Sequence, residues 1–178
     1  FQQLAGHVIF AGRALRPSSE AILRGAAAQS GLWSQGISGD LPIVLLRISD
    51  AEHLESAREL LQAHEYWRLK GLAADLVIMN ERQSSYIQDF NIALETLVRT
   101  MRTRPHPAED QQAQGRVFVL RADLIPAETR ALLSSAARVV LVAQRGTLLD
   151  QLERLTEPVA TSRLPPKPAV VSDVPRSS

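Results

Sequence analysis

Four short apolar runs, separated by segments with the period of a helix, constrain the fold of this sequence more than any other feature. Unbroken runs of this kind are typical of strands buried on both faces of a parallel sheet. The first run begins with Pro42, which suits the first position of a strand because no ladder hydrogen bond is lost there. The predicted strands are residues 42–48, 75–80, 116–121 and 139–142. The side chains expected to be buried are Val44, Leu46, Val77, Val119 and Leu141.

The segments between the predicted strands have helical spacing, and several begin with a capping residue. Ser49 and Glu52 have the spacing of a capping box ahead of a helix that ends at Gly71. Ser85 is expected to cap the next helix and Thr147 the last one. Because each crossover is long enough to return the chain beside a parallel neighbour, we predict a three-layer α/β fold. It contains a four-stranded, mainly parallel sheet with helices on both faces.

Two helices are expected ahead of the sheet, and a proline-rich tail after it. Residues 3–15 place Leu4 and Val8 on one face of an amphipathic helix, and a second helix follows. Prolines recur from Pro158 onward, which favours a linker without a packed core. The predicted division is a helical pair at 1–31, an α/β domain at 32–157 and a linker at 158–178.

Composition argues against several classes of function. The formal charge is +1 and the arginines are spread along the chain, so no basic footprint for nucleic acid is present. The chain has no cysteine. No apolar run approaches the roughly 18 residues of a membrane span, so no membrane contact by this segment is expected. The chain also lacks an initiating methionine, and we therefore expect it to be a piece of a longer protein.

The motifs that hold cofactors and metals are missing from the sequence. Neither the G-x-G-x-x-G dinucleotide fingerprint nor the G-x-x-x-x-G-K-[ST] phosphate loop occurs. His7, His53, His64 and His106 have no partner at metal-ligand spacing. We therefore expect neither a cofactor nor a metal in this segment.

Polar residues follow each predicted strand, and open parallel sheets bind ligands outside the carboxyl ends of their strands. These residues are Ser49 and Asp50, Asn80 and Glu81, Arg121 and Asp123, and Gln144 and Arg145. The candidate ligand-binding residues are Asn80, Glu81, Arg121 and Asp123, together with Asp40 ahead of the first strand. The simpler interpretation is that they are ordinary polar residues of turns and caps. No catalytic residue is assigned, because acid/base chemistry needs a second group opposite the first.

A glycine-bearing turn precedes the first strand. Gly36 and Gly39 are expected to allow positive φ or a close approach of the backbone. Asp40 follows them and could accept hydrogen bonds from backbone N–H groups. Trp33 and Trp67 could each stack on a sugar, but the favoured interpretation of both is packing, since a tryptophan provides much buried area.

Longer stretches of the chain resemble the cyclic β-1,2-glucan synthases, over roughly residues 4 to 155. The resemblance is carried by residues 32–43 (LWSQGISGDLPI), 64–72 (HEYWRLKGL), 75–81 (DLVIMNE), 115–123 (GRVFVLRAD) and 136–141 (AARVVL). No single stretch is a catalytic motif, so no catalytic residue is carried over from the family.

The resemblance implies a place within a much larger protein. Those synthases are inner-membrane proteins that join a glucosyltransferase module, which uses UDP-glucose, to a glycoside-phosphorylase-like module. This segment would lie between two carbohydrate-binding sandwich domains, ahead of the phosphorylase-like module, as a soluble segment on the cytoplasmic side. Its implied partners are the neighbouring domains and β-1,2-glucan. The leading hypothesis is a non-catalytic structural or docking domain, and the alternative is a carbohydrate-binding module.

Overall fold

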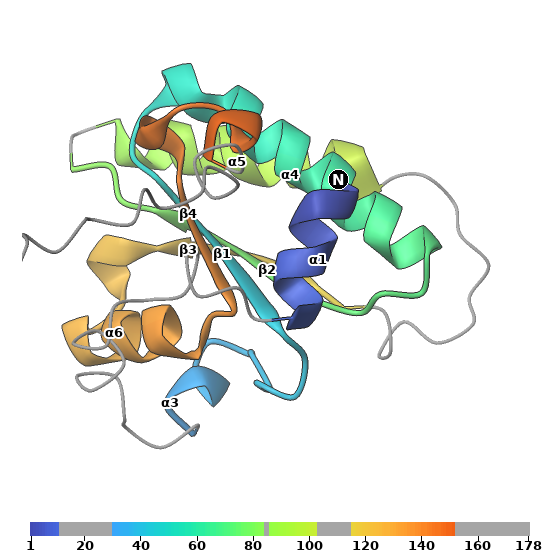
Figure 1. Ribbon diagram of the computed structural model, residues 1–178. Coiled ribbons are helices and arrows are strands. Elements are labelled where there is room, and N and C mark those ends of the chain that lie inside the picture. Colours follow the sequence, from blue (N-terminus) through green and yellow to red (C-terminus); the bar gives the residue numbers. More distant parts are fainter. Residues whose placement is uncertain (11–29, 84–85, 103–114, 152–178) are drawn as a thin grey trace, which may run out of the picture.

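A computed structural model describes residues 1–10, 30–83, 86–102 and 115–151 of the chain. Within these ranges the chain forms one sheet of four parallel strands in the order β3-β2-β1-β4 (Figure 1). The strands are β1 (Ile43–Ile48), β2 (Asp75–Asn80), β3 (Val117–Arg121) and β4 (Val139–Val142). The predicted parallel sheet is therefore confirmed.

Helices cover both faces of this sheet, as predicted. Figure 1 shows α4 and α5 on one side of the strands and α6 and α3 on the other. The α-helices are α1 (Gln2–Phe10), α3 (Ser30–Trp33), α4 (Leu54–Leu69), α5 (Ile87–Arg102) and α6 (Ala127–Ala136). Short 3₁₀ turns follow three strands: η2 (Ala51–His53), η3 (Ala122–Leu124) and η4 (Ala143–Arg145).

The strand order explains the two helical layers. The chain moves outward from β1 to β2 and β3 and then returns to the far side of β1 as β4. Because parallel crossovers are right-handed, this change of direction puts α6 on the face opposite α4 and α5. The point where the direction changes, between β1 and β4, is the topological switch point of the sheet.

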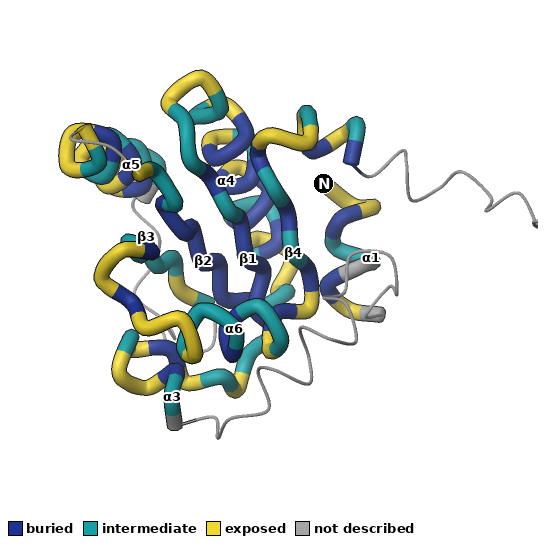
Figure 2. The backbone as a smooth tube through the Cα atoms, turned by 90° about the vertical axis from the view of Figure 1, so that its left-hand side faces the viewer, coloured by how far each residue is buried: buried dark blue, intermediate teal, exposed yellow. Residues whose placement is uncertain are grey.

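Alternate residues of the central strands supply two separate cores. Val44, Leu46 and Ile48 of β1 face α4 and α5, and α1 adds Leu4 and Val8 to that cluster. The other face of β1 carries Ile43 and Leu45, which pack with α3 and α6. Figure 2 shows the buried central strands β1 and β2 between their more exposed surroundings. Both faces of β1 are therefore buried, as its apolar sequence predicts.

One predicted core residue is less buried than expected. Val44, Leu46, Val77 and Leu141 are buried, whereas Val119 is only partly buried. Val119 lies on β3, which among the described residues ends the sheet on one side and pairs only with β2. The apolar sequence of β3 resembles that of a central strand, and only the strand order shows that it lies at the edge.

The helix termini correct one prediction and confirm another. Asp50, rather than Ser49, caps the turn after β1, since its Oδ1 accepts the N–H of Glu52 at 3.2 Å. Thr147 acts as predicted: its Oγ1 accepts the N–H of Asp150 at 3.1 Å, and Asp150 Oδ2 accepts the N–H of Thr147 at 2.8 Å.

Several predictions fall outside the described residues. They are the continuation of the first helix beyond residue 10, most of the second predicted helix, the cap at Ser85, His106 and the linker at 158–178. None of the helices in the described ranges is both long and apolar enough to cross a membrane.

Candidate functional site

The five predicted site residues lie at opposite ends of the strands. Asn80, Glu81, Arg121 and Asp123 lie at the end where the parallel strands finish, which we call the carboxyl edge. Asp40 precedes β1 at the other end, the amino edge. A strand of six residues spans roughly 20 Å. The structure therefore brings four of the five together and separates Asp40 from them.

Two ion pairs lie at the carboxyl edge, Arg121 with Asp123 and Arg47 with Glu81. Arg121 donates from Nε to Asp123 Oδ1 at 3.2 Å and from Nη2 to Asp123 Oδ2 at 2.7 Å. This pairing raises the pKa of Arg121 and lowers the pKa of Asp123, in each case chiefly through the side-chain hydrogen bond. Nearby, Arg47 Nε donates to Glu81 Oε1 at 2.8 Å.

Asn80 joins the end of β2 to the helix that follows it. The side chain is fully buried, its Oδ1 accepts the N–H of Arg82 at 3.0 Å, and its Nδ2 donates to the carbonyl of Ile87 at 3.4 Å. A buried amide with both its ends hydrogen-bonded to backbone holds a turn in place. This arrangement fits the simpler interpretation of Asn80 as a turn residue.

Side chains also bridge the switch point between β1 and β4. Gln144 Nε2 donates to Ser49 Oγ, which ties the loop after β4 to the loop after β1. Gln151, which sequence reasoning did not single out, is buried and contacts the same loop after β4. Its Oε1 accepts the N–H of Val142 at 3.3 Å, and its Nε2 donates to the carbonyls of Val142 and Gly146, each at 3.1 Å.

The amino edge is hollowed on both sides of the glycine turn. Gly36 and Gly39 have φ of 74° and 77°, so the predicted positive φ is confirmed at both. One hollow of about 410 Å³ is lined by Leu32, Gly39, Asp40, Leu41, Pro42, Ile43, Leu132, Ala136 and Arg138. The other, about 320 Å³, is called the amino-edge pocket and is lined by Gly36, Ser38, Asp40, Leu41, Asp75, Arg116 and Phe118.

Asp75 is the buried acid of the amino-edge pocket. Its exposed fraction is 4%, and its Oδ1 accepts the N–H of Arg116 at 2.9 Å. Burial raises the pKa of Asp75, while the hydrogen bond from Arg116 acts in the opposite direction. Sequence reasoning missed this residue as a site candidate. The available signal was an acid at the first position of an otherwise apolar strand.

A buried histidine lies next to Asp75. His64, on α4, is 6% exposed and its Nε2 lies 2.8 Å from the carbonyl oxygen of Ala74. Burial is the main cause that lowers the pKa of His64. A neutral imidazole that donates Nε2–H to this carbonyl satisfies both groups.

The glycine turn differs from its prediction in two respects. Among the described residues, the hydrogen bond of Asp40 runs from its own N–H to Ser38 Oγ at 3.2 Å, and no backbone N–H donates to its carboxylate. Trp33 is 64% exposed and donates from Nε1 to the carbonyl of Ser38 at 3.3 Å, so its predicted packing role is wrong. The adjacent Leu32 takes the buried position of this short helix.

Trp67 packs as predicted. It is 1% exposed, and its Nε1 donates to the carbonyl of Phe1 at 3.2 Å. It belongs to the core formed by α1, α4 and α5. Across the described ranges, no group of three or more His, Asp or Glu side chains is placed to hold a metal ion.

The parallel sheet, its switch point and its two helical layers define an open, doubly wound α/β domain. No family model matches the chain. Over 156 residues, or 88% of its length, the chain is 42% identical to the cyclic β-(1,2)-glucan synthase NdvB of Rhizobium meliloti (strain 1021). The chain spans 5% of the length of that protein. The resemblance is thus confirmed, and this chain matches a short segment of that cyclic β-(1,2)-glucan synthase.

Proposed function

We propose that this chain is a non-catalytic structural or docking domain of a cyclic β-1,2-glucan synthase. Glucosyl transfer from UDP-glucose would then be carried out by other parts of the whole protein. The observation that best supports this proposal is the pairing of charges at the carboxyl edge, where ligands bind in folds of this class.

A catalytic acid or base must face its substrate in the correct protonation state. At the carboxyl edge, Asp123 is held by two hydrogen bonds from Arg121, and Glu81 is held by Arg47. The pKa of Asp123 is lowered by its partner, which disfavours the protonated form that a general acid needs. These pairs are suited to stabilising loops and poorly suited to proton transfer.

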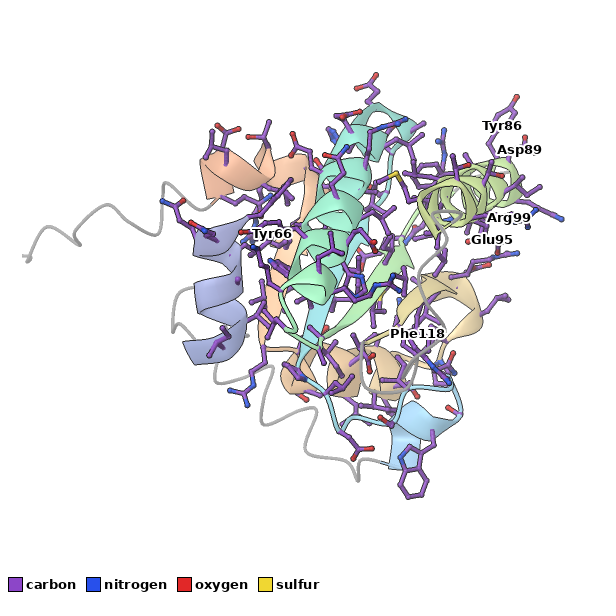
Figure 3. All side chains as sticks on the ribbon, turned by 90° about the vertical axis from the view of Figure 1, so that its right-hand side faces the viewer. Tyr66, Tyr86, Asp89, Glu95, Arg99 and Phe118 are labelled. Carbon is purple, nitrogen blue, oxygen red and sulfur yellow. The ribbon has the colours of Figure 1, made fainter. Side chains whose placement is uncertain are left out.

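The outer side of α5 supports a docking role. Tyr86, Asp89, Glu95 and Arg99 project from this side of the molecule, away from the sheet (Figure 3), and all four are exposed. Ile92 on the same helix is 54% exposed. A mixed surface with a tyrosine, an apolar side chain and both signs of charge resembles the contact surfaces between domains of one chain.

The test of this proposal is an assay of the purified chain for two reactions, glucosyl transfer from UDP-glucose and phosphorolysis of β-1,2-glucan. We expect neither reaction above the level of a mock purification. Turnover that remains with the chain through a further purification step would contradict the non-catalytic proposal.

The alternative function, a carbohydrate-binding module, is favoured by one specific observation. The amino-edge pocket combines a buried carboxylate, an aromatic ring and exposed polar side chains, and it lies away from the paired charges of the carboxyl edge. A domain without catalytic residues can hold a polysaccharide for catalytic modules elsewhere in the same protein.

A further inference from the structure

We propose that the amino-edge pocket binds one glucosyl unit of a β-1,2-glucan, with Asp75 accepting sugar hydroxyls and Phe118 contacting the C–H face of the ring. The choice of sugar rests on the proposed membership of a cyclic β-1,2-glucan synthase. The location of the site rests on the pocket itself.

The hydrogen bonding of Asp75 is incomplete. One oxygen accepts the N–H of Arg116 at 2.9 Å. Within the described part of the chain, the second oxygen has no hydrogen-bond partner, although the side chain is 4% exposed and lines the pocket. That oxygen is not fully enclosed by protein atoms, so it is open to the pocket. A ligand hydroxyl in the pocket would supply the missing donor.

An aromatic side chain, Phe118, forms part of the lining of the pocket. Phe118 is only partly buried, lines the pocket, and packs beside the core on the α3 and α6 face of the sheet (Figure 3). Gly36 lies beside it, and a Cβ at Gly36 would be 3.9 Å from Phe118 Cε1. A longer side chain at that position would cover the ring. An apolar wall with a few placed polar groups is the usual composition of a small-ligand site.

The charge of the pocket selects a neutral ligand. Asp40 and Asp75 contribute two carboxylates, and Arg116 contributes one guanidinium. This excess of negative charge repels a phosphate or a nucleoside diphosphate. A neutral sugar that donates hydroxyl hydrogens to carboxylates meets no such repulsion. The volume of about 320 Å³ is at the lower end of the range for small-ligand sites, roughly 300 to 1,000 Å³, and suits one sugar unit.

The linkage of the polymer gives the proposal its specificity. An internal unit of a β-1,2-glucan keeps its neighbouring 3- and 4-hydroxyls free, so both can donate to one carboxylate oxygen. Internal units of β-1,3- and β-1,4-glucans have used one of these hydroxyls in the linkage. We therefore expect selectivity for the β-1,2 polymer, because a site that hydrogen-bonds two hydroxyls discriminates against a ligand that lacks one.

The experiment is calorimetric titration of the 178-residue chain with a linear β-1,2-gluco-oligosaccharide of about five units. We expect saturable binding to the wild type, and at least tenfold weaker binding to Asp75→Asn and to Phe118→Leu. Asp40→Asn is a second pocket variant with an exposed side chain, so a binding defect there does not depend on the core. Asp89→Asn, on the outer side of α5, is the matched control and should bind as the wild type does. Thermal melts of all variants establish that each is folded.

Each other outcome has a defined meaning. No binding to the wild type at millimolar sugar overturns the inference, and the non-catalytic proposal then stands or falls by the turnover assay alone. Equal binding of β-1,3- or β-1,4-gluco-oligosaccharides, or tighter binding of UDP-glucose, also overturns it. A loss of binding in Asp123→Asn with none in Asp75→Asn would place the sugar at the carboxyl edge and contradict the proposal.

Discussion

The acidic residues Asp123 and Asp75, at the two edges of the sheet, differ in burial, in hydrogen-bond partners and in the direction of their pKa shifts. At the carboxyl edge, Asp123 is exposed, is paired with Arg121, and has a lowered pKa. At the amino edge, Asp75 is buried, shares one oxygen with a backbone N–H, and has a raised pKa. At the strand ends expected to bind ligands, Glu81 and Asp123 are thus already held by arginines of the same chain. At the opposite edge, one oxygen of Asp75 has no hydrogen-bond partner among the described residues.

The largest loss of stability is expected for a substitution at Gly115, where the backbone of the amino edge is crowded. Gly115 has φ of 79°, and a Cβ there would lie 2.0 Å from the carbonyl oxygen of Ala74. Gly115→Ala should lower the free energy of unfolding by about 3 kcal/mol or more, from backbone strain and this clash. Urea denaturation measures the loss. Gly71→Ala is the matched control, since Gly71 has φ of 76° with nothing within 4 Å, and should lose about 1 kcal/mol. Similar losses in both variants would contradict the expected crowding.

The glycine turn should be sensitive to its backbone more than to its charge. Gly39→Ala should cost about 1 to 2 kcal/mol, because the φ of Gly39 is 77°. Asp40→Asn should change stability less, since Asp40 is exposed and its hydrogen bond to Ser38 uses its backbone N–H. Both are measured by denaturation at neutral pH. A larger loss in Asp40→Asn would show that the carboxylate itself orders the turn.

His64 should make the amino edge sensitive to mild acid. Burial lowers the pKa of His64 in the folded chain below the value of about 6.5 that it has when unfolded. The unfolded chain therefore takes up the proton first as the pH falls below about 6.5, and stability decreases. Neighbouring Glu65 and Asp75 favour the charged form and reduce this effect, whereas Arg68 adds to it.

The measurement for His64 is thermal stability between pH 7.5 and pH 5. We expect His64→Gln to lose less stability over this range than the wild type, because glutamine keeps a donor for Ala74 but does not titrate. Parallel pH profiles for the two proteins would show that His64 does not contribute.

The smallest effects distinguish the two acids. The raised pKa of Asp75 means that the unfolded chain ionises first as the pH rises above about 4, so ionised Asp75 reduces stability. Asp75→Asn should therefore be at least as stable as the wild type at pH 7. The lowered pKa of Asp123 has the opposite sign, with a stabilising contribution that is present above about pH 4 and lost in acid. Asp123→Asn should be slightly less stable at pH 7. Changes of equal sign in these two melts would contradict the contrast between the edges.

The sequence predicts the strands and helices well because local patterns determine them. Four apolar runs and the helical spacing between them are sufficient to predict the sheet. The cap at Thr147 is also visible in the sequence, because Asp150 follows three residues later and exchanges hydrogen bonds with it. Local sequence patterns do not determine the strand order. Val119 was expected in the core because its sequence cannot show that β3 has a neighbour on one side only.

The candidate site was less predictable because its contacts join distant parts of the chain. Asp75 meets the backbone of Arg116, 41 residues away, and Gln144 meets Ser49, 95 residues away. No local pattern reports such pairs. Asp40 is instructive, since its position before a strand already separated it from residues that follow strands. Grouping it with them overlooked a signal that the sequence contains.

The buried amide of Gln151 has a consequence for what the sheet can join. It offers Val142 one donor and one acceptor, the same pair of groups that an adjacent strand would offer. At Val142, the last residue of β4, the side chain of Gln151 thus makes the two hydrogen bonds that a neighbouring strand would make. An exposed strand edge is a template for pairing with other chains, and the hydrogen bonds of Gln151 occupy part of that edge. Sheet extension beside the end of β4 would first have to displace Gln151.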